Sequence, residues 1–252
     1  MYMKELFDSK KVSEKKVITR IDVENKVVNK YKDNVVVETS IPLYVNSEFY
    51  ALFTCSPTKI REMIIGNLLS QKIISKLDEI HYLKKHEGKI IVKLKQNSKS
   101  SPRAFIYKRL KKEFYPLKLT PETILNSANE LGKKASVFRK TGGTHVACLY
   151  SAEGNLLLFS EDIGRYNAID KVIGEATLKG IDLRKTFLTI SGRVTIGIIA
   201  KAANMKIPVV ISVSAPTDKA VEAAEKIGLT LVGFARNKRF NVYSHLERIQ
   251  SV

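Results

Sequence analysis

The stretch that decides the fold is TFLTISGRVTIGIIAKAANMKIPVVISV, residues 186–213. It opens with an apolar, β-branched run at 186–190, which predicts a strand. An amphipathic pattern at about 194–204 predicts a helix, and a second apolar run at 208–213 predicts another strand. A strand, a helix and a second strand in this order indicate an α/β protein built on a layered sheet.

The same alternation extends outward in both directions. The pattern predicts, in chain order, strands at 145–150 and up to residue 159, a helix at 164–178, a helix at 216–227 and a strand at 230–235. A further helix begins at Thr120 and Pro121, because a hydroxyl cap before a proline is a strong start signal. Its apolar stripe ends at Gly132, a residue suited to a C-terminal cap. We therefore place an α/β domain at residues 119–252.

The first half of the chain is predicted to form a smaller β-rich domain, residues 1–118. Strand-like sequence occurs at 16–23, 34–45 and 81–94. Ser56 and Pro57 repeat the helix-start signal, so one helix is expected at about 57–70. The polar run at 96–101 is predicted to be a loop.

The composition limits the class of protein. The chain has 252 residues, of which 44% are apolar, and a formal net charge of +18, which fits a globular protein and excludes disorder as its main theme. It shows no apolar run of the roughly 18 residues that a membrane helix needs, and no signal-peptide pattern, so we expect a cytoplasmic protein with no membrane partner. Its two cysteines, Cys55 and Cys148, lie too far apart in sequence for a disulfide framework or a Cys-rich metal site.

Positive charge is concentrated in residues 84–118, where 12 Lys and Arg residues stand against two acidic residues. Such a field attracts anionic partners, whether nucleic acid, a phosphorylated cofactor or an acidic protein surface. A solvated lysine-rich surface explains the same composition. No RNP-type, zinc-finger or helix-turn-helix pattern occurs, so nucleic acid is not the predicted partner.

Five motifs fall where predicted strands meet loops or helices, which is where ligands gather in α/β sheets. They are TGGTH (141–145), EDIGRYNAIDK (161–171), SGR (191–193), SVSAPT (212–217) and FARNKR (234–239). Paired glycines let backbone N–H groups approach a phosphate or a planar ring, and a guanidinium beside small residues suits an anion. Three cations after a strand can neutralise a pyrophosphate, with Phe234 available to stack on a base.

Each motif also has a purely structural explanation. A glycine pair before a strand is commonly a turn, acids in a first helical turn complement the macrodipole, and Ser214 or Thr217 can be an ordinary helix cap. The sequence has no nucleophile elbow, P-loop or dinucleotide fingerprint, and its four histidines lack companions at zinc spacing. The residues by themselves therefore predict a protein that binds a phosphorylated, nucleotide-like ligand, with no catalytic residue and no metal site assigned.

Taken in order, the motifs resemble the FdhD family of sulfur carriers needed for formate dehydrogenase maturation. The family pattern of TGG-x-H, EDxGRxNAxDKxxG, SGR, SAPT and LTLVGFxR reads here as TGGTH, EDIGRYNAIDKVIG, SGR, SAPTDKAVEAAEKIG and LTLVGFARNKRFNVY. The likeness is dense over residues 138–249. In the first half it is thinner and rests on 38–46 and 56–74.

This resemblance implies a three-layer, cytidine-deaminase-like α/β domain with a smaller β-rich N-terminal domain, usually in a homodimer. It implies a protein that accepts sulfur from a cysteine desulfurase as a persulfide. The sulfur would pass to the molybdenum or tungsten bis(molybdopterin guanine dinucleotide) cofactor before insertion into formate dehydrogenase. The expected cofactor-binding residues are Gly142, Gly143, Thr144, His145, Glu161, Asp162, Arg165, Asn167, Asp170, Lys171, Ser191, Gly192, Arg193, Ser214, Phe234, Ala235, Arg236, Asn237, Lys238 and Arg239.

The chain departs from the family at the persulfide cysteine, which belongs to a C-x-x-C loop. The corresponding stretch, KQNSKSSPRAFIY at 95–107, contains no cysteine, and serine cannot carry a persulfide. Cys148 lies in an apolar strand, so we expect a buried thiol that points away from His145. Two functions remain open: sulfur transfer through an unexpected thiol, or binding and delivery of the cofactor without covalent chemistry.

Two hypotheses concern individual groups. The carboxylate of Glu161 or Asp162 is expected to accept the N–H donors of guanine and so to select the base. The basic segment 84–118 is expected to close over the cleft and hold the phosphates, through Lys108, Arg109, Lys111 and Lys112. Cytidine deamination is excluded, because the H-x-E and P-C-x-x-C zinc elements are absent.

Overall fold

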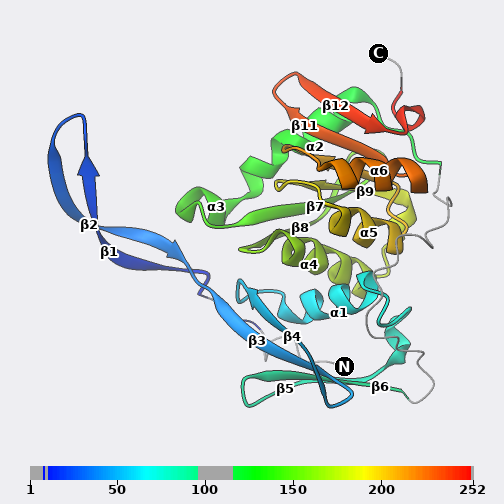
Figure 1. Ribbon diagram of the computed structural model, residues 1–252, viewed down its shortest axis with the longest axis horizontal. Coiled ribbons are helices and arrows are strands. Elements are labelled where there is room, and N and C mark those ends of the chain that lie inside the picture. The colour runs from blue at the N-terminus through cyan, green and yellow to red at the C-terminus, as the bar shows by residue number, and fades with distance from the viewer. Residues whose placement is uncertain (1–7, 9–10, 96–115, 251–252) are drawn as a thin grey trace.

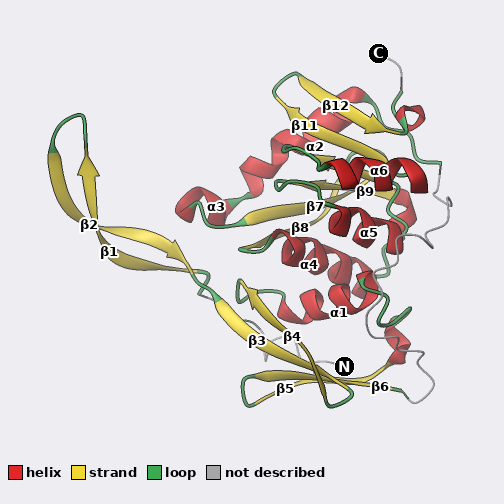
Figure 2. Cartoon of the chain, viewed as in Figure 1, coloured by secondary structure: helices red, strands yellow, loops and turns green. Residues whose placement is uncertain are grey.

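The computed structural model describes residue 8 and residues 11–95 and 116–250. The chain folds around two sheets, and a long two-stranded ribbon projects from them (Figures 1 and 2). The architecture is mixed α/β, as the sequence predicts. Within the described residues, no helix is both long enough and apolar enough to cross a bilayer.

The larger sheet lies in the second half of the chain, with six strands in the order β12-β11-β10-β9-β7-β8. The strands are β7 (His145–Ser151), β8 (Leu156–Asp162), β9 (Thr186–Ile190), β10 (Val209–Ser212), β11 (Thr230–Arg236) and β12 (Arg239–Ser244). β9, β10 and β11 run parallel, whereas β7, β8 and β12 pair antiparallel with their neighbours. The carboxyl ends of the three parallel strands therefore meet at one edge, which is the usual ligand-binding edge of such sheets.

Helices cover both faces of this sheet. One face packs against α4 (Arg165–Leu178), α5 (Ile196–Asn204) and α6 (Asp218–Ile227), and the other against α2 (Pro121–Lys134), which continues into α3 (Ser136–Thr141). Alternate residues of β7 enter the two cores: Leu149 lies on the α4 side, and Cys148 and Tyr150 lie on the α2 side. The central strands are apolar on both faces because both faces are buried.

The first half contains a four-stranded sheet in the order β4-β3-β6-β5. Its strands are β3 (Thr39–Val45), β4 (Glu48–Cys55), β5 (Ile80–His86) and β6 (Lys89–Leu94). The helix α1 (Ile60–Ser70) covers one face, where Met63 and Leu68 are fully buried against Leu43 and Val92. Strands β1 (Ser13–Asp22) and β2 (Val27–Val36) pair only with each other and form the projecting ribbon.

The two halves meet where α1 crosses α4 in direct backbone contact. A Cβ atom added to Gly66 would lie 1.9 Å from the carbonyl oxygen of Asp170, and one added to Gly174 would lie 1.9 Å from that of Glu62. Any side chain at either position would collide with backbone, so the crossing requires glycine on both helices.

A buried ion pair with a full set of hydrogen bonds lies beside this crossing. The carboxylate of Asp170, at 0% exposure, accepts from Lys201 Nζ at 2.8 Å, Ser70 Oγ at 2.9 Å and Asn67 Nδ2 at 2.9 Å. Removing one partner from such a pair typically costs about 3–5 kcal/mol, because the remaining charge is left buried. The polar groups therefore fix how α1, α4 and α5 sit against one another.

The start of α1 differs from the prediction. The helix begins at Ile60, because Asp8 rather than Ser56 caps it: the Asp8 carboxylate accepts from the N–H of Lys59 at 2.8 Å and of Ile60 at 3.0 Å. The Ser56 hydroxyl instead accepts from the N–H of Ile163 at 3.2 Å. A cap supplied from fifty residues away leaves no local signal.

Other element boundaries are partly as predicted. α2 begins at the Thr120 cap, whose hydroxyl accepts from the N–H of Thr123 at 3.1 Å, but it runs past Gly132 to Lys134. The strand predicted at 81–94 is a hairpin that turns at Glu87 and Gly88. β12 was not predicted, because its polar residues obscure the alternation.

We predict that Gly174→Ala destabilises the fold by about 1–3 kcal/mol or more, because the new Cβ collides with the Glu62 carbonyl. The matched control is Gly132→Ala, where a Cβ on α2 meets nothing within 4 Å, and which should stabilise by about 0.5–1 kcal/mol. Urea unfolding of both variants tests this. Equal effects from the two substitutions would contradict the glycine crossing.

Candidate functional site

The loops at the carboxyl edge of the sheet are bonded to one another. The Ser212 hydroxyl donates to the Gly192 carbonyl at 2.8 Å. The Val194 N–H donates to the Ala215 carbonyl at 3.0 Å, and the Phe234 N–H donates to the Ser214 carbonyl at 3.1 Å. The SGR, SVSAPT and FARNKR segments therefore come together at one edge, as the sequence predicts, and their Ser212 hydroxyl serves the scaffold.

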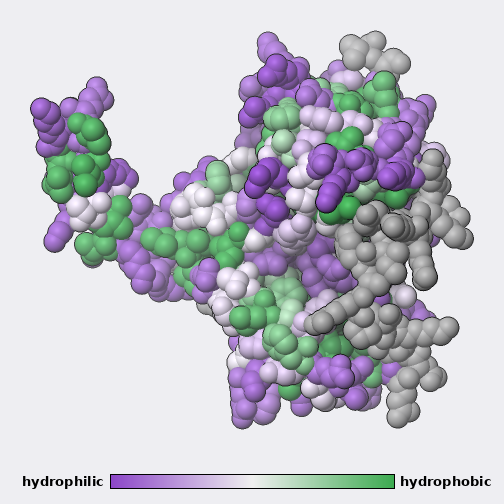
Figure 3. Space-filling model, in the orientation of Figure 1, coloured by the Kyte–Doolittle hydropathy of each residue, from purple (hydrophilic) through white to green (hydrophobic). Residues whose placement is uncertain are grey.

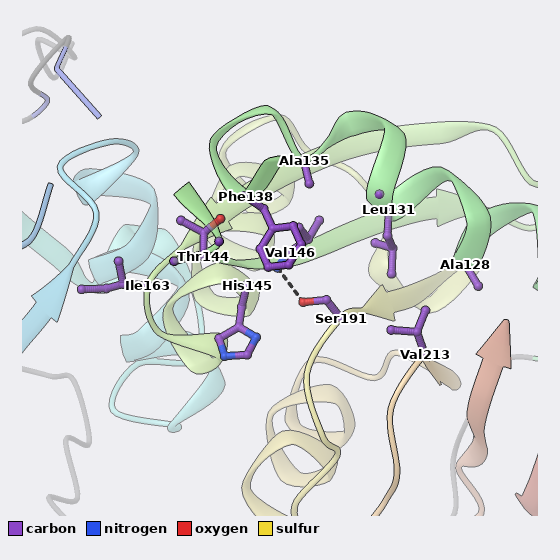
Figure 4. Close-up of a pocket in the computed structure, with 13 residues that line it drawn as sticks. Ala128, Leu131, Ala135, Phe138, Thr144, His145, Val146, Ile163, Ser191 and Val213 are labelled. Carbon is purple, nitrogen blue, oxygen red and sulfur yellow. Dashed lines mark hydrogen bonds between the residues drawn. The ribbon is translucent and has the colours of Figure 1, made fainter. Parts of the chain in front are cut away.

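A pocket of about 500 Å³ opens beside this edge, between the sheet and helices α2 and α3 (Figure 4). Its wall is mainly apolar and includes Leu131, Phe138 and Val146, while Thr144 and His145 supply polar groups. Phe138 is 47% exposed, so a large aromatic face is available to a ligand. This volume suits one ring system or nucleoside-sized group.

The TGGTH motif shapes the mouth of this pocket. Gly142 has a φ of +67° and ends α3 as its C-terminal cap, a conformation that favours glycine. A Cβ on Gly143 would lie 2.7 Å from Cγ1 of Val36, so the loop lies tightly against the root of the ribbon. Backbone conformation explains Gly142 and close packing explains Gly143, and both glycines also line the pocket.

The Glu161 carboxylate anchors the short helix α3. It accepts from the N–H groups of Val137 at 3.1 Å and Phe138 at 2.8 Å, and from the Thr144 hydroxyl at 2.9 Å. Glu161 therefore positions Phe138 and Thr144 for the pocket and does not line it. These bonds leave its carboxylate little capacity for the guanine contact expected from the sequence.

Arg165, His145 and Gly192 form a polar corner, of which His145 lines the pocket and Gly192 lies beside the other two residues. A Cβ on Gly192 would lie 3.3 Å from both His145 Nδ1 and Arg165 Cβ, so any larger residue there would crowd these two side chains. The Nε atom of Arg165 is buried without a hydrogen-bond partner. Burial, and then the charge of Arg165, hold the pKa of His145 below its ordinary value, while Asp162 acts in the opposite sense. The imidazole thus lies close to a guanidinium whose Nε has no hydrogen-bond partner and which lies over the Tyr166 ring, an arrangement that favours an anion.

Several charged residues of EDIGRYNAIDK lie in the interface between the halves, which corrects their predicted placement in the cleft. Asp162 is fully buried, pairs with Lys171, and accepts from the backbone N–H of Ser56 at 3.0 Å. Asn167 donates to the Thr54 carbonyl at 2.8 Å. Asp170 and Lys171 are at 0% exposure, so they contact no ligand from the surface. Their density reflects the burial of α4 between two cores.

The FARNKR segment is a hairpin turn between β11 and β12. Arg236, Asn237, Lys238 and Arg239 are exposed, whereas Ala235 is buried in the α2-side core. Phe234 has a φ of +52°, and the guanidinium of Arg236 lies 5.8 Å from its ring centroid. Its exposed cations, like Arg193, lie outside the pocket lining.

Both thiols of the chain are buried. Cys55 ends β4 and Cys148 lies within β7, each at 0% exposure. Burial raises the pKa of each thiol to about 12. Neither lines the pocket, and Cys148 and His145 lie on opposite faces of β7, as predicted from strand alternation. The described residues contain no group of His, Cys, Asp and Glu that could hold a metal ion.

Sequence reasoning missed the apolar wall. The α2 stripe that includes Leu131 serves both the core and the pocket, so its periodicity indicates burial alone. No sequence pattern indicated the short helix α3, and nothing except its aromatic ring set Phe138 apart as a candidate. The basic segment expected to close over the cleft, including Lys108, Arg109, Lys111 and Lys112, falls mostly outside the described residues, as does the stretch matching the C-x-x-C loop.

Comparison with known proteins places these features in a family. The model of the FdhD/NarQ family matches residues 36–250. The chain is 35% identical over 241 residues to the sulfur carrier protein FdhD of Saccharolobus solfataricus, covering 87% of this chain and 93% of that protein. It is 34% identical over 244 residues to the sulfur carrier protein FdhD of Bacillus subtilis, covering 88% and 93%.

Among solved structures, the fold is similar to a protein from Desulfotalea psychrophila described as a formate dehydrogenase accessory protein. The TM-score is 0.85, and the match covers 95% of this chain and 100% of that one. The two sequences are 24% identical, so this likeness concerns the fold.

We predict that His145 titrates below its ordinary value of 6.5, so it is neutral at pH 7. Because the unfolded chain binds this proton more readily, His145 makes stability fall as the pH drops below about 6.5. Replacing Arg165 with Gln should move the His145 pKa part of the way back up, since burial remains. NMR titration of the imidazole measures this, with Arg184→Gln as the control. A His145 midpoint at or above 6.5 in the unaltered chain would refute the assignment.

Proposed function

The chain belongs to the FdhD/NarQ family, and from that membership together with the pocket we propose that it is an accessory protein of formate dehydrogenase maturation. Its cargo would be the molybdenum or tungsten bis(molybdopterin guanine dinucleotide) cofactor, held by a guanine nucleotide end before insertion into the enzyme. The observation that carries this proposal is the buried Nε of Arg165, which has no hydrogen-bond partner and lies near His145, a residue of the apolar pocket wall.

The residues present fit a nucleotide end. Phe138 and Leu131 offer a flat apolar surface for a base. Arg165 and the neutral His145 would lie near the phosphates, with the exposed Arg193 and Arg236 available for the rest of an anionic cargo. In this arrangement apolar stacking holds the ring and charge orients the phosphates. A pocket of about 500 Å³ takes one such end, not the whole cofactor.

For the chemistry, we favour cofactor binding and delivery without a persulfide on this chain. The chain has two cysteines, and burial raises the pKa of both thiols to about 12, which removes the thiolate that sulfur transfer needs. The alternative is supported by the names of the relatives, which are sulfur carriers. In that case the terminal sulfur of a desulfurase persulfide would pass to a protein thiolate, leaving the desulfurase thiol reduced.

The remaining expectations are part of the same proposal. A cytidine-deaminase-like domain at 119–252 is supported by helices on both faces of its sheet, and the β-rich part at 1–118 by the four-stranded sheet with α1. The proposed partners are formate dehydrogenase and a cysteine desulfurase, with the protein acting as a homodimer in the cytoplasm.

We expect GDP, as a probe of the cofactor's nucleotide end, to bind the purified chain and to lose about tenfold or more in affinity with Arg165→Gln, since a charge-assisted bond is lost. The control Arg184→Gln removes an exposed guanidinium paired with Asp182, away from the pocket, and should bind GDP normally. Isothermal titration measures both. Unchanged affinity with Arg165→Gln would place the nucleotide elsewhere.

Incubation with cysteine and an active cysteine desulfurase, followed by intact mass with and without reductant, separates the two chemical alternatives. We expect no added sulfur, because both thiols are buried and protonated. A desulfurase control on another acceptor shows that the enzyme works. A reducible gain of one sulfur that disappears in Cys55→Ala or Cys148→Ala would instead make the chain a sulfur carrier.

A further inference from the structure

The β1–β2 ribbon projects from the body without a covering layer. Its strands, Ser13–Asp22 and Val27–Val36, pair along their whole length. In the described part of the chain, no third strand joins them. Figures 1 and 3 show the ribbon standing clear of the body with hydrophobic residues on its surface. A two-stranded sheet alone is marginally stable in water, so this ribbon is suited to being covered.

One face of the ribbon is both apolar and basic. Residues directly opposite in an antiparallel pair share a face, which puts Val17 beside Lys32 and Ile21 beside Val28. Val17, Ile21 and Val28 are 68%, 67% and 65% exposed. The same face carries exposed lysines and no acidic residue; the lysines are Lys15, Lys30 and Lys32. We call this set the basic–apolar face.

The opposite face balances its own charges. There Glu14 pairs with Lys16, and the guanidinium of Arg20 lies 4.2 Å from the ring centroid of Tyr31. Asp22 and Asp33 belong to this face as well. The uncompensated positive charge of the ribbon is therefore on the basic–apolar face.

We propose that the basic–apolar face docks an acidic, aliphatic surface of a protein partner. The charge requires an anionic partner, and β-branched side chains spaced along a strand fit aliphatic protein surface. The face has no aromatic residue for stacking on bases or for anchoring at a lipid interface, which disfavours nucleic acid and membranes. Self-pairing of this face with the same face of a second copy is disfavoured, because Lys15, Lys30 and Lys32 would meet the same three lysines.

The root of the ribbon adjoins the pocket. Under the proposed function, on which this step rests, a partner docked on the ribbon would therefore lie near the cargo. Val36, the last residue of β2, presses on Gly143 of the pocket mouth. Just outside the two strands, the Val37 N–H donates a hydrogen bond to the Val12 carbonyl at 3.0 Å, which joins the two chain segments at the root. A partner held on the ribbon would lie beside the mouth and could exchange the cargo without releasing it to solvent.

The test uses purified formate dehydrogenase and purified cysteine desulfurase from the same organism, each titrated by biolayer interferometry at two salt concentrations. The double variant Lys30→Glu, Lys32→Glu reverses charge on the face. The matched control, Lys16→Glu with Lys26→Glu, makes the same net change on the other face and in the turn. Circular dichroism checks that each variant is folded, and Ile21→Ser tests the apolar contribution.

We expect at least one of the two proteins to bind, with affinity reduced about tenfold or more by the face variant and about twofold or less by the control. Ile21→Ser should weaken binding without changing its salt dependence. Equal losses in both double variants, or no binding of either protein to the unaltered chain, would overturn the proposal. So would loss of duplex DNA or anionic vesicle binding in the face variant with protein binding intact. GDP titration of the same preparations reports separately on the proposed function.

Discussion

The backbone contact between α1 and α4 is the constraint on which the rest of the structure depends. Gly66 and Gly174 bring the helices together until carbonyl oxygens fill the space of their missing side chains. Because α4 is fixed at this depth, its first residue, Arg165, is held at the SGR loop beside His145. The polar corner is thus a consequence of how the two halves pack. A substitution at the α1–α4 crossing would therefore shift the guanidinium of Arg165.

The charged motif at the start of α4 has two separate tasks along one helix. Its first turn holds Arg165 beside Gly192 of the SGR loop, while later turns bury Asp170 and Lys171 against the other half. The burial of full charges is costly unless each is paired and hydrogen-bonded, and here each is. Rigidity of this kind suits a site that must hold a guanidinium in place although its Nε has no hydrogen-bond partner, since a looser helix would let the guanidinium turn toward solvent.

Much of the fold was predictable from sequence, because β9, β10 and β11 are continuous apolar runs between amphipathic helices. The positions of α4, α5 and α6 followed from the same alternation, to within about two residues. The Asp8 cap was not predictable, since it comes from a distant part of the chain. The burial of Asp170 was not predictable either, because local sequence patterns place charged residues on the surface. Only the tertiary structure shows that Lys201 pairs with Asp170 in the interior.

The site was predictable as an edge of the sheet but not as a cavity. Motif spacing located the SGR loop, because the carboxyl ends of the parallel strands meet at one edge. The start of β7, with His145, lies at the same edge because β7 runs antiparallel to β9. The wall built by Leu131 and Phe138 depends on the angle at which α2 and α3 cross the sheet, which no residue pattern encodes. The thiols illustrate the reverse case: a strand pattern was enough to expect Cys148 to be buried.

The α1–α4 crossing also has a consequence for synthesis on the ribosome. Gly66 and Gly174 are separated by about a hundred residues. At a synthesis rate of roughly 5–20 residues per second, α4 therefore emerges several seconds or more after α1. During that interval the close-packing face of α1 and its buried polar groups have no counterpart. The nascent N-terminal half therefore stays incompletely packed, with α1 accessible to chaperones, until the second half has been synthesised and covers that helix.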